Sequence, residues 1–189
     1  MKITNANPAQ SHEIAKLIMM AMSDDCCLNL AGPQHSLSEF EEMMIELVQM
    51  ENSQYSYQNT FIATEDDVIM GMCVGYDGAR LHELRKAYLD MAKKTFGRVD
   101  PNMDDEAQAD EFYIDSLAVL PRFRNQGIAS QLLRKIIEKA KTLGITKVGL
   151  LVDKNNPRAE HLYTAQGFQY VDDAMWGGHP MKHLQIVNY

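Results

Sequence analysis

A strand that runs into a helix through a short basic loop is the feature that most constrains this chain. Residues 111–120 form a half-alternating, partly β-branched run that stops at Pro121, which predicts a strand. From Gly127 onward, apolar residues recur at three- and four-residue steps, which predicts an amphipathic helix. The expected buried face of this helix consists of Ile128, Ala129, Leu132, Leu133, Ile136, Ile137, Ala140 and Leu143, and Gly144 is placed to end it.

The loop between this strand and this helix has the chemistry of a phosphate site. The first amides of a helix lack internal partners and lie at the positive end of its dipole. Arg122 and Arg124 add forked cationic donors, and Asn125 tolerates the left-handed backbone that a concave set of amides requires. Gly127 lets a ligand approach the backbone because it has no Cβ. On these residues alone, a phosphate-bearing cofactor and a plain solvated loop remain equally open.

Composition narrows the class of protein and its partners. The 189 residues suffice for one domain, and the formal net charge of −8 argues against DNA or RNA. Cys26, Cys27 and Cys73 are odd in number and lack zinc spacing, so neither a disulfide framework nor a metal site is expected. The N-terminus lacks a signal core, and the longest apolar run, residues 68–75, is too short to span a bilayer. We therefore expect a cytoplasmic protein without a nucleic-acid or membrane partner.

Strands and helices alternate along the rest of the chain. Strands are expected at residues 2–4, 60–64, 68–76, 147–152, 168–171 and 181–187, the second and third joined as a hairpin. Helices are expected to begin at Pro8, at Ser36 or Ser38, near Arg80, and at Asn155 or Asn156. Residues 24–34 are expected to form a polar break, and residues 176–180 a loop between the last strands.

Two motifs in this order resemble those of the GCN5-related N-acetyltransferase (GNAT) superfamily. The basic loop is similar to the Arg/Gln-x-x-Gly-x-Gly/Ala signature, here Arg124-x-x-Gly127-x-Ala129. Asn125 takes a place that is often glycine in the family, and Ala129 replaces the commoner second glycine. The second motif lies downstream and comprises Val152, Asn156, Ala159, Leu162, Tyr163, Gly167 and Phe168. The resemblance covers about the last two fifths of the chain.

The resemblance implies an α/β (α+β) fold in a single domain over residues 1–189. Its mixed sheet of six to seven strands would carry helices on both faces, and its fourth and fifth strands would splay apart in a V that admits acetyl-CoA. Residues 80–110 make a longer connection than the family core usually has, so they look like a helical insertion. A substrate lid, a dimer contact and a solvated elaboration are all open for this segment.

The resemblance also implies which residues bind acetyl-CoA. The pantetheine arm would take backbone hydrogen bonds from Val119 and a contact from Asn156, for which helix capping is the alternative. The Leu117 N–H would donate to the thioester carbonyl. The pyrophosphate would bind the amides of one run, which comprises Arg124, Asn125, Gln126, Gly127, Ile128, Ala129 and Ser130.

Proton transfer would involve Tyr163 and Asp115. Tyr163 matches the family tyrosine that protonates the leaving thiolate, and a core or edge tyrosine is the alternative. Alternation along the strand would put Asp115 on the same face as Leu117, which makes it a candidate general base. Glu111 is a second candidate, and for both a solvated strand-end carboxylate is the alternative. The histidines, His161 included, are expected to be surface or structural residues.

The expected function is N-acetyl transfer from acetyl-CoA, by direct attack in a ternary complex, to a primary amine of a small molecule or peptide. The alternative is a CoA-binding sensor or scaffold without turnover. A third possibility is an interaction module that uses Trp176 and residues 80–110. The acceptor would bind near Asp24, Asp25 and Trp176, and the protein is expected to be a monomer or a homodimer.

Overall fold

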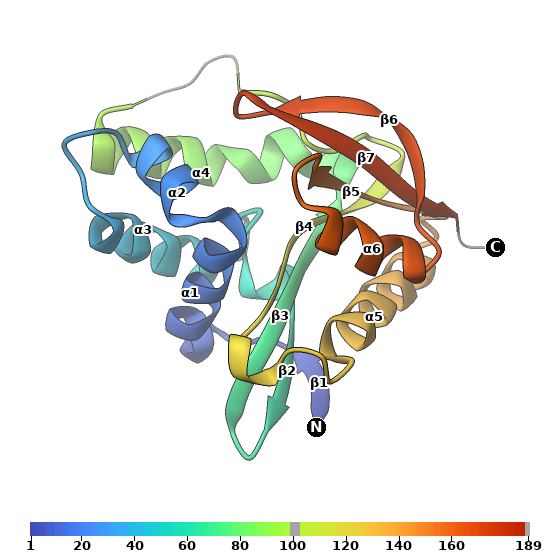
Figure 1. Ribbon diagram of the computed structural model, residues 1–189. Coiled ribbons are helices and arrows are strands. Elements are labelled where there is room, and N and C mark those ends of the chain that lie inside the picture. Colours follow the sequence, from blue (N-terminus) through green and yellow to red (C-terminus); the bar gives the residue numbers. More distant parts are fainter. Residues whose placement is uncertain (99–102, 188–189) are drawn as a thin grey trace.

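The computed structural model describes residues 1–98 and 103–187, which form one mixed sheet with helices on both of its faces (Figure 1). The strands are β1 (Lys2–Asn5), β2 (Thr60–Glu65), β3 (Val68–Asp77), β4 (Glu111–Val119), β5 (Lys147–Asp153), β6 (Gln169–Trp176) and β7 (His179–Val187). The helices are α1 (Ser11–Met22), α2 (Asp24–Ala31), α3 (Leu37–Gln49), α4 (Leu81–Phe96), α5 (Ile128–Thr142) and α6 (Pro157–Ala165). Strand order is β1-β2-β3-β4-β5-β7-β6, with β4 and β5 parallel and the other neighbours antiparallel. The predicted fold class is confirmed.

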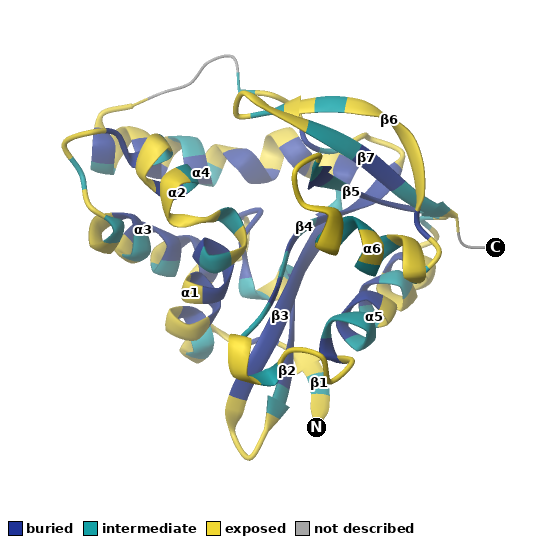
Figure 2. Cartoon of the chain, in the orientation of Figure 1, coloured by how far each residue is buried: buried dark blue, intermediate teal, exposed yellow. Residues whose placement is uncertain are grey.

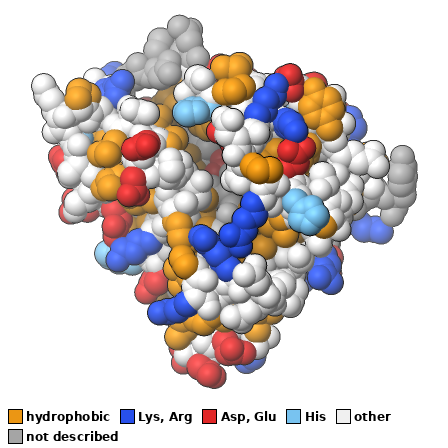
Figure 3. All heavy atoms as spheres, viewed as in Figure 1, with side chains coloured by type: hydrophobic (Ala, Val, Ile, Leu, Met, Phe, Trp, Pro, Cys, Tyr) orange, Lys and Arg blue, Asp and Glu red, His pale blue; other side chains and the backbone are white. Residues whose placement is uncertain are grey.

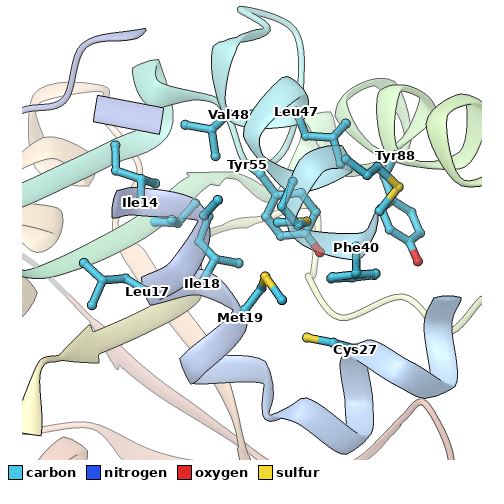
Figure 4. Packing of buried hydrophobic residues seen from close by; sticks show 14 of the residues in the cluster. Ile14, Leu17, Ile18, Met19, Cys27, Phe40, Leu47, Val48, Tyr55 and Tyr88 are labelled. Atoms are coloured by element: carbon cyan, nitrogen blue, oxygen red, sulfur yellow. The ribbon is translucent and has the colours of Figure 1, made fainter. Parts of the chain in front are cut away.

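Two hydrophobic clusters, one on each face of the sheet, make up most of the core (Figure 2). Helices α1 to α4 cover the first face, and Figure 4 shows their side chains, among them Ile18, Cys27 and Phe40, converging between the helices. Helix α5 covers the other face with residues such as Leu132, which is fully buried. Buried aliphatic and aromatic side chains contribute roughly 2 kcal/mol each to stability, so both faces stabilise the sheet that carries the site.

Local sequence signals give the starts of several elements correctly. Ser36 caps α3, since its hydroxyl accepts a hydrogen bond from the Glu39 N–H at 3.3 Å. Pro8 opens a short 3-10 turn immediately before α1. The hairpin between β2 and β3 turns at Asp66 and Asp67, whose φ angles of 48° and 63° suit a tight hairpin turn.

The polar break predicted after the first helix is wrong, because α2 occupies most of it. Ser23 caps this helix, since its hydroxyl accepts the backbone N–H three residues on at 3.4 Å. Asp24 and Asp25 lie in the first turn, where carboxylates interact favourably with the helix dipole. Only Cys27 and Ala31 of this helix are buried, so its apolar periodicity is too short to be recognised in the sequence.

The loop predicted at residues 176–180 is also wrong, because β6 and β7 extend into it. The two strands join through a two-residue turn of Gly177 and Gly178, with φ angles of 56° and 81°. Trp176 and His179 pair across this turn as strand residues. A two-glycine turn can adopt the left-handed backbone of a hairpin at both positions, which lets the strands run on to the turn.

Helix α5 buries a narrower face than expected. Ala129 and Ile137 are half-buried, and Leu143 is 52% exposed because it lies beyond the last helical residue, at the C-cap. The other five predicted core positions are buried.

Helix α4 belongs to the core. Its predicted apolar face of Leu81, Leu84, Tyr88 and Met91 is buried, so this helix is not a solvated elaboration. Residues 99–102 of the predicted insertion lie outside the described residues. An insertion relative to the family, a lid and a dimer contact stay predictions.

Two further observations concern the cysteines and the length of the helices. Cys26, Cys27 and Cys73 are all free. No helix within residues 1–98 and 103–187 is long and apolar enough to cross a membrane.

Candidate functional site

Strands β4 and β5 separate part-way along their length. They pair over four residues of β4, from Glu111 to Ile114. β4 then continues to Val119 and β5 runs on beyond its last paired residue, Leu150, without further pairing between them in the described part of the chain. The predicted V-shaped splay is therefore present, and β4 has an open edge after Ile114.

The backbone groups of Leu117 and Val119 face this open edge. The Leu120 N–H donates to the Met70 carbonyl at 2.8 Å, so Leu120 faces β3. Backbone groups alternate in direction along a strand, and Val119 and Leu117 therefore point away from β3. The Val119 carbonyl accepts a hydrogen bond from Arg124 Nε at 3.1 Å on this side. The edge is thus open to an extended ligand that adds to the sheet.

Asp115 is the extra residue of a β-bulge in β4. Ile114 and Ser116 pair with consecutive residues of β3, which leaves Asp115 with no residue opposite. Side chains normally alternate between the two faces of a sheet, but the bulge shifts this alternation by one residue. Ile114 and Leu117, three residues apart, therefore both pack in the cluster beneath α5. The prediction that Asp115 shares a strand face with Leu117 is therefore wrong.

Asp115 instead lies among polar side chains on the face covered by α1 to α4. Its Oδ2 accepts hydrogen bonds from the Tyr76 hydroxyl at 3.3 Å and from Gln54 Nε2 at 3.4 Å, and Ser116 donates to Oδ1 at 2.9 Å. Burial, and then the negative charge of Glu106, raise the pKa of Asp115 to about 7. A carboxyl with this pKa can take up a proton at neutral pH, which a general base must do.

The loop before α5 has the left-handed backbone expected of an amide cradle. Asn125 has φ 62° and Gly127 has φ 76°. The side chains of Arg124 and Gln126 are exposed. A Cβ built on Gly127 would meet no heavy atom within 4 Å, so the space in front of this residue is open.

The first turn of α5 has amides available for a ligand. No side chain caps the helix, and Gln131 makes a first-turn bond, to the Gly127 carbonyl at 3.2 Å. The N–H groups of Ile128, Ala129 and Ser130 come before it and lack intrahelical partners.

Two arginines make contacts within the loop that precedes these amides. Arg158 of α6 donates to Asn125 Oδ1 at 3.4 Å, and Arg122 lies over the Phe123 ring at 4.8 Å. Figure 3 shows Lys and Arg side chains gathered between α6 and the loop before α5, beside a hollow in this face. A local cationic group on a chain of net charge −8 suits a phosphate-bearing ligand.

Helix α6 brings Asn156 and Tyr163 to the other side of the splay. Asn156 Oδ1 accepts a hydrogen bond from the Ala159 N–H at 3.1 Å, so this side chain caps the helix. Helix capping is the alternative to a pantetheine contact in the sequence analysis. Tyr163 is half-buried against the α5 cluster, with its ring edge-on to Phe168 at 6.0 Å between centroids. Burial, and to a lesser degree Cys73, raise the pKa of Tyr163, so the phenol stays protonated at neutral pH.

Glu111 is not a solvated strand-end carboxylate. It is fully buried, and Oε2 lies 2.9 Å from His183 Nε2 and 2.7 Å from Gln185 Nε2. A Cβ on Gly149 would lie 1.8 Å from this oxygen, so glycine is required there for the carboxylate to fit between β4 and β5. With both of these partners in β7, Glu111 is better suited to joining strands than to catalysis.

His183 should make stability depend on pH. Burial disfavours its charge, but hydrogen bonds and charges from Glu111 and Asp172 outweigh this and raise its pKa above 6.5. The stabilisation is therefore fully present below pH 6.5 and is lost as the pH rises through the raised pKa. We expect His183→Gln to lower the free energy of unfolding by about 2 kcal/mol at pH 6 and by less at pH 9, measured by urea unfolding.

The matched control is His179→Gln on the same strand. The His179 side chain is 62% exposed, and its Nδ1 lies 3.9 Å from Asp153 Oδ2. It should change stability little at either pH. An equal loss at both pH values in His183→Gln would contradict the assigned ionisation.

Sequence reasoning missed three residues that surround Asp115. Gln54 follows α3, Tyr76 lies near the end of β3, and Glu106 lies in the segment after α4. Each is buried, with exposed fractions of 5% or less. A buried Glu beside a buried Gln is unusual, but no local pattern marks either residue in the sequence.

Comparisons with known proteins show what this chain is similar to. A model of the acetyltransferase (GNAT) family matches residues 25–168. GCN5-related N-acetyltransferase 6, chloroplastic, of Arabidopsis thaliana is 42% identical over 60 residues, which cover 32% of this chain and 21% of that protein. Thialysine N-epsilon-acetyltransferase of Bos taurus is 37% identical over 62 residues, which cover 33% of this chain and 36% of that protein. The chain thus spans well under half the length of these curated relatives.

Solved structures match over the whole chain. The crystal structure of an acetyltransferase is 27% identical with a TM-score of 0.85, and covers 100% of both chains. An N-acetyltransferase from Staphylococcus aureus Mu50 is 26% identical with a TM-score of 0.83, over 98% of this chain and 100% of that one.

Proposed function

Because the chain belongs to the acetyltransferase (GNAT) family, we propose that it transfers an acetyl group from acetyl-CoA to a primary amine of a small molecule or peptide. The observation that carries this proposal is the open edge of β4, which lies between the amides at the start of α5 and the Tyr163 helix. Acetyl-CoA supplies a thioester carbonyl that an amine attacks directly in a ternary complex.

The donor half of the site would bind acetyl-CoA through backbone groups. Val119 offers its N–H and carbonyl to the pantetheine arm, which would take the carbonyl in place of Arg124 Nε. The amides from Arg124 to Ser130 would hold the pyrophosphate, with Arg122 and Arg158 beside them. The fit is supported by the uncapped α5 terminus and by the open space at Gly127.

Three groups would serve the transfer itself. The Leu117 N–H would donate to the thioester oxygen as negative charge develops, an interaction worth roughly 3 kcal/mol when such a donor is removed. Asp115 would take a proton from the amine, directly or through water. Tyr163 would protonate the leaving thiolate, since its phenol stays protonated. Asn156 remains a candidate pantetheine contact in addition to its capping role.

We infer a cytoplasmic location, which the three free cysteines support. The acceptor would enter between α2 and the β6–β7 hairpin. The hairpin turn is held from one side, because the Gly177 N–H donates to Asp104 Oδ2 at 3.2 Å.

The test is to incubate the protein with acetyl-CoA and a panel of small amines and N-terminal peptides, and to follow thiol release. At least one amine should accelerate release about tenfold over the amine-free rate, because positioning in a ternary complex favours its attack. Mass spectrometry should identify the acetylated amine. Micromolar acetyl-CoA binding with no acceleration by any amine would favour the sensor function instead.

A further inference from the structure

A buried polar cluster joins Asp115 to parts of the chain that the proposed reaction does not otherwise use. It comprises Gln54, Tyr76, Arg85, Glu106 and Asp115, from four separate segments and strand β4. Arg85 is 4% exposed and Glu106 is 5% exposed. Burying this much charge costs folding free energy unless the charges are paired, so packing alone does not account for the cluster.

Asp115 and Glu106 share the same two hydrogen-bond donors. The Tyr76 hydroxyl lies 3.3 Å from Asp115 Oδ2 and 3.1 Å from Glu106 Oε1. Gln54 Nε2 lies 3.4 Å and 3.2 Å from the same two oxygens. One phenol hydrogen cannot be donated to both carboxylates at once. Both carboxyl groups can bond to the Tyr76 hydroxyl only if one of them is protonated. The protonated carboxyl then donates a hydrogen bond to the phenol oxygen, and the phenol donates to the other, ionised carboxylate.

Burial raises the pKa of Glu106, and Arg85 opposes this shift by favouring the ionised carboxylate. Arg85 Nη2 pairs with Glu106 Oε2, and its Nη1 donates to Asp105 Oδ1 at 3.0 Å. Within residues 1–98 and 103–187, Asp115 accepts hydrogen bonds from Gln54, Tyr76 and Ser116 and from no cationic side chain. The proton of the pair therefore belongs on Asp115.

The other ionisable side chains that face Asp115 stay neutral. Tyr55, Tyr76 and Tyr113 are buried, and burial raises the pKa of each phenol well above its ordinary value. Burial likewise raises the pKa of the Cys73 thiol. Among these groups of the described chain, Glu106 is thus the one whose charge acts on Asp115 at neutral pH.

We propose that Asp115 and Glu106 hold one proton between them through Tyr76, which makes Glu106 the positioning residue for the Asp115 base. This inference rests on the proposed function for its catalytic meaning. Asp115 must be ionised before the reaction. The amine proton then passes to Asp115 Oδ2, so the N–H bond breaks and an O–H bond forms; this becomes the one proton of the pair, while Glu106 stays ionised against Arg85. The second carboxylate thereby favours the protonated form of Asp115 that the reaction produces.

The experiment is a carboxyl ¹³C NMR titration of the 189-residue chain, with the Asp115 signal assigned by its loss in Asp115→Asn. In Glu106→Gln the Asp115 midpoint should fall by about one pH unit, because the like charge is gone. In Asp115→Asn the Glu106 midpoint should change little, because Asp115 is already neutral at the lower pH where Glu106 titrates. In Tyr76→Phe the Asp115 midpoint should fall, because protonated Asp115 loses the phenol oxygen that accepts its hydrogen bond.

Asp105→Asn is the matched control, since Asp105 also pairs with Arg85 but is half exposed and makes no hydrogen bond to Asp115. It should leave the Asp115 midpoint within about 0.3 pH unit. If Tyr76→Phe instead raises the Asp115 midpoint, the phenol only donates to ionised Asp115, the pair does not share a proton through Tyr76, and the proposal is overturned. An unmoved midpoint in Glu106→Gln would overturn it as well.

A kinetic measurement separates this inference from the proposed function. The acid limb of kcat/KM should move to lower pH in Glu106→Gln by the same interval as the NMR midpoint, with the acetyl-CoA Kd unchanged. If no amine is acetylated, the proposed function fails, while the titration still decides whether the two carboxyls are coupled. An acid limb that stays in place while the NMR midpoint moves would remove Asp115 as the base.

Discussion

Gly127→Trp is expected to abolish measurable acetyl-CoA binding, with a rise in Kd of at least about a hundredfold, or roughly 2.7 kcal/mol. The indole would project into the open space in front of the first amides of α5, where the pyrophosphate is proposed to bind. The glycine also has φ 76°, and a side chain disfavours this backbone angle. Isothermal titration calorimetry with acetyl-CoA measures the effect.

Gly144→Trp is the matched control at the other end of the α5 segment. Gly144 also has φ 76° and also has no heavy atom within 4 Å of a built Cβ. Its substitution should therefore cost similar backbone strain without touching the amide cradle. Equal acetyl-CoA affinity in Gly127→Trp and Gly144→Trp would refute the placement of the pyrophosphate.

The backbone features of the proposed donor half could be predicted from the sequence because their determinants are local. The left-handed backbone at Asn125 and Gly127 and the free amides of α5 arise within one short run. The capping of α6 by Asn156 is equally local. Such features depend on residue type at fixed spacing, which a sequence displays directly.

The surroundings of the candidate base could not be predicted because they depend on pairing at long range. The bulge at Asp115 is defined by its register with β3, and a one-residue shift of this kind reverses the side of every later side chain. Glu106 lies in a polar segment that is typical of a solvated loop. Its burial is decided by Arg85 and Tyr76, which are 21 and 30 residues away in the chain.

Helix α2 shows a third reason for a wrong prediction. Its cap and acidic first turn are ordinary helix signals, but its eight residues bury only Cys27 and Ala31. A helix this short is marginal by itself, so packing against the rest of the first cluster must supply its stability. Tertiary contacts of this kind leave little trace in a hydrophobic pattern.

The second large effect is expected at Tyr163. Tyr163→Phe should lower kcat by about a thousandfold, within the range for loss of a positioned proton donor, while the acetyl-CoA Kd stays unchanged. The substitution removes only the hydroxyl, so the edge-on contact with Phe168 and the packing against the α5 cluster remain. Stability should therefore change little, and pre-steady-state thiol release measures the chemical step.

Tyr170→Phe controls for the loss of a phenol elsewhere on the same part of the chain. Tyr170 is 56% exposed and donates to Asp173 Oδ1 at 3.2 Å, away from the open edge of β4. Its kcat should stay near that of the unmodified protein. Burial keeps the Tyr163 phenol protonated, so loss of its proton should not produce an alkaline limb in the pH profile of turnover near neutral pH. An unchanged kcat in Tyr163→Phe would show that solvent, not Tyr163, protonates the leaving thiolate. The proposed role of Tyr163 would then be refuted.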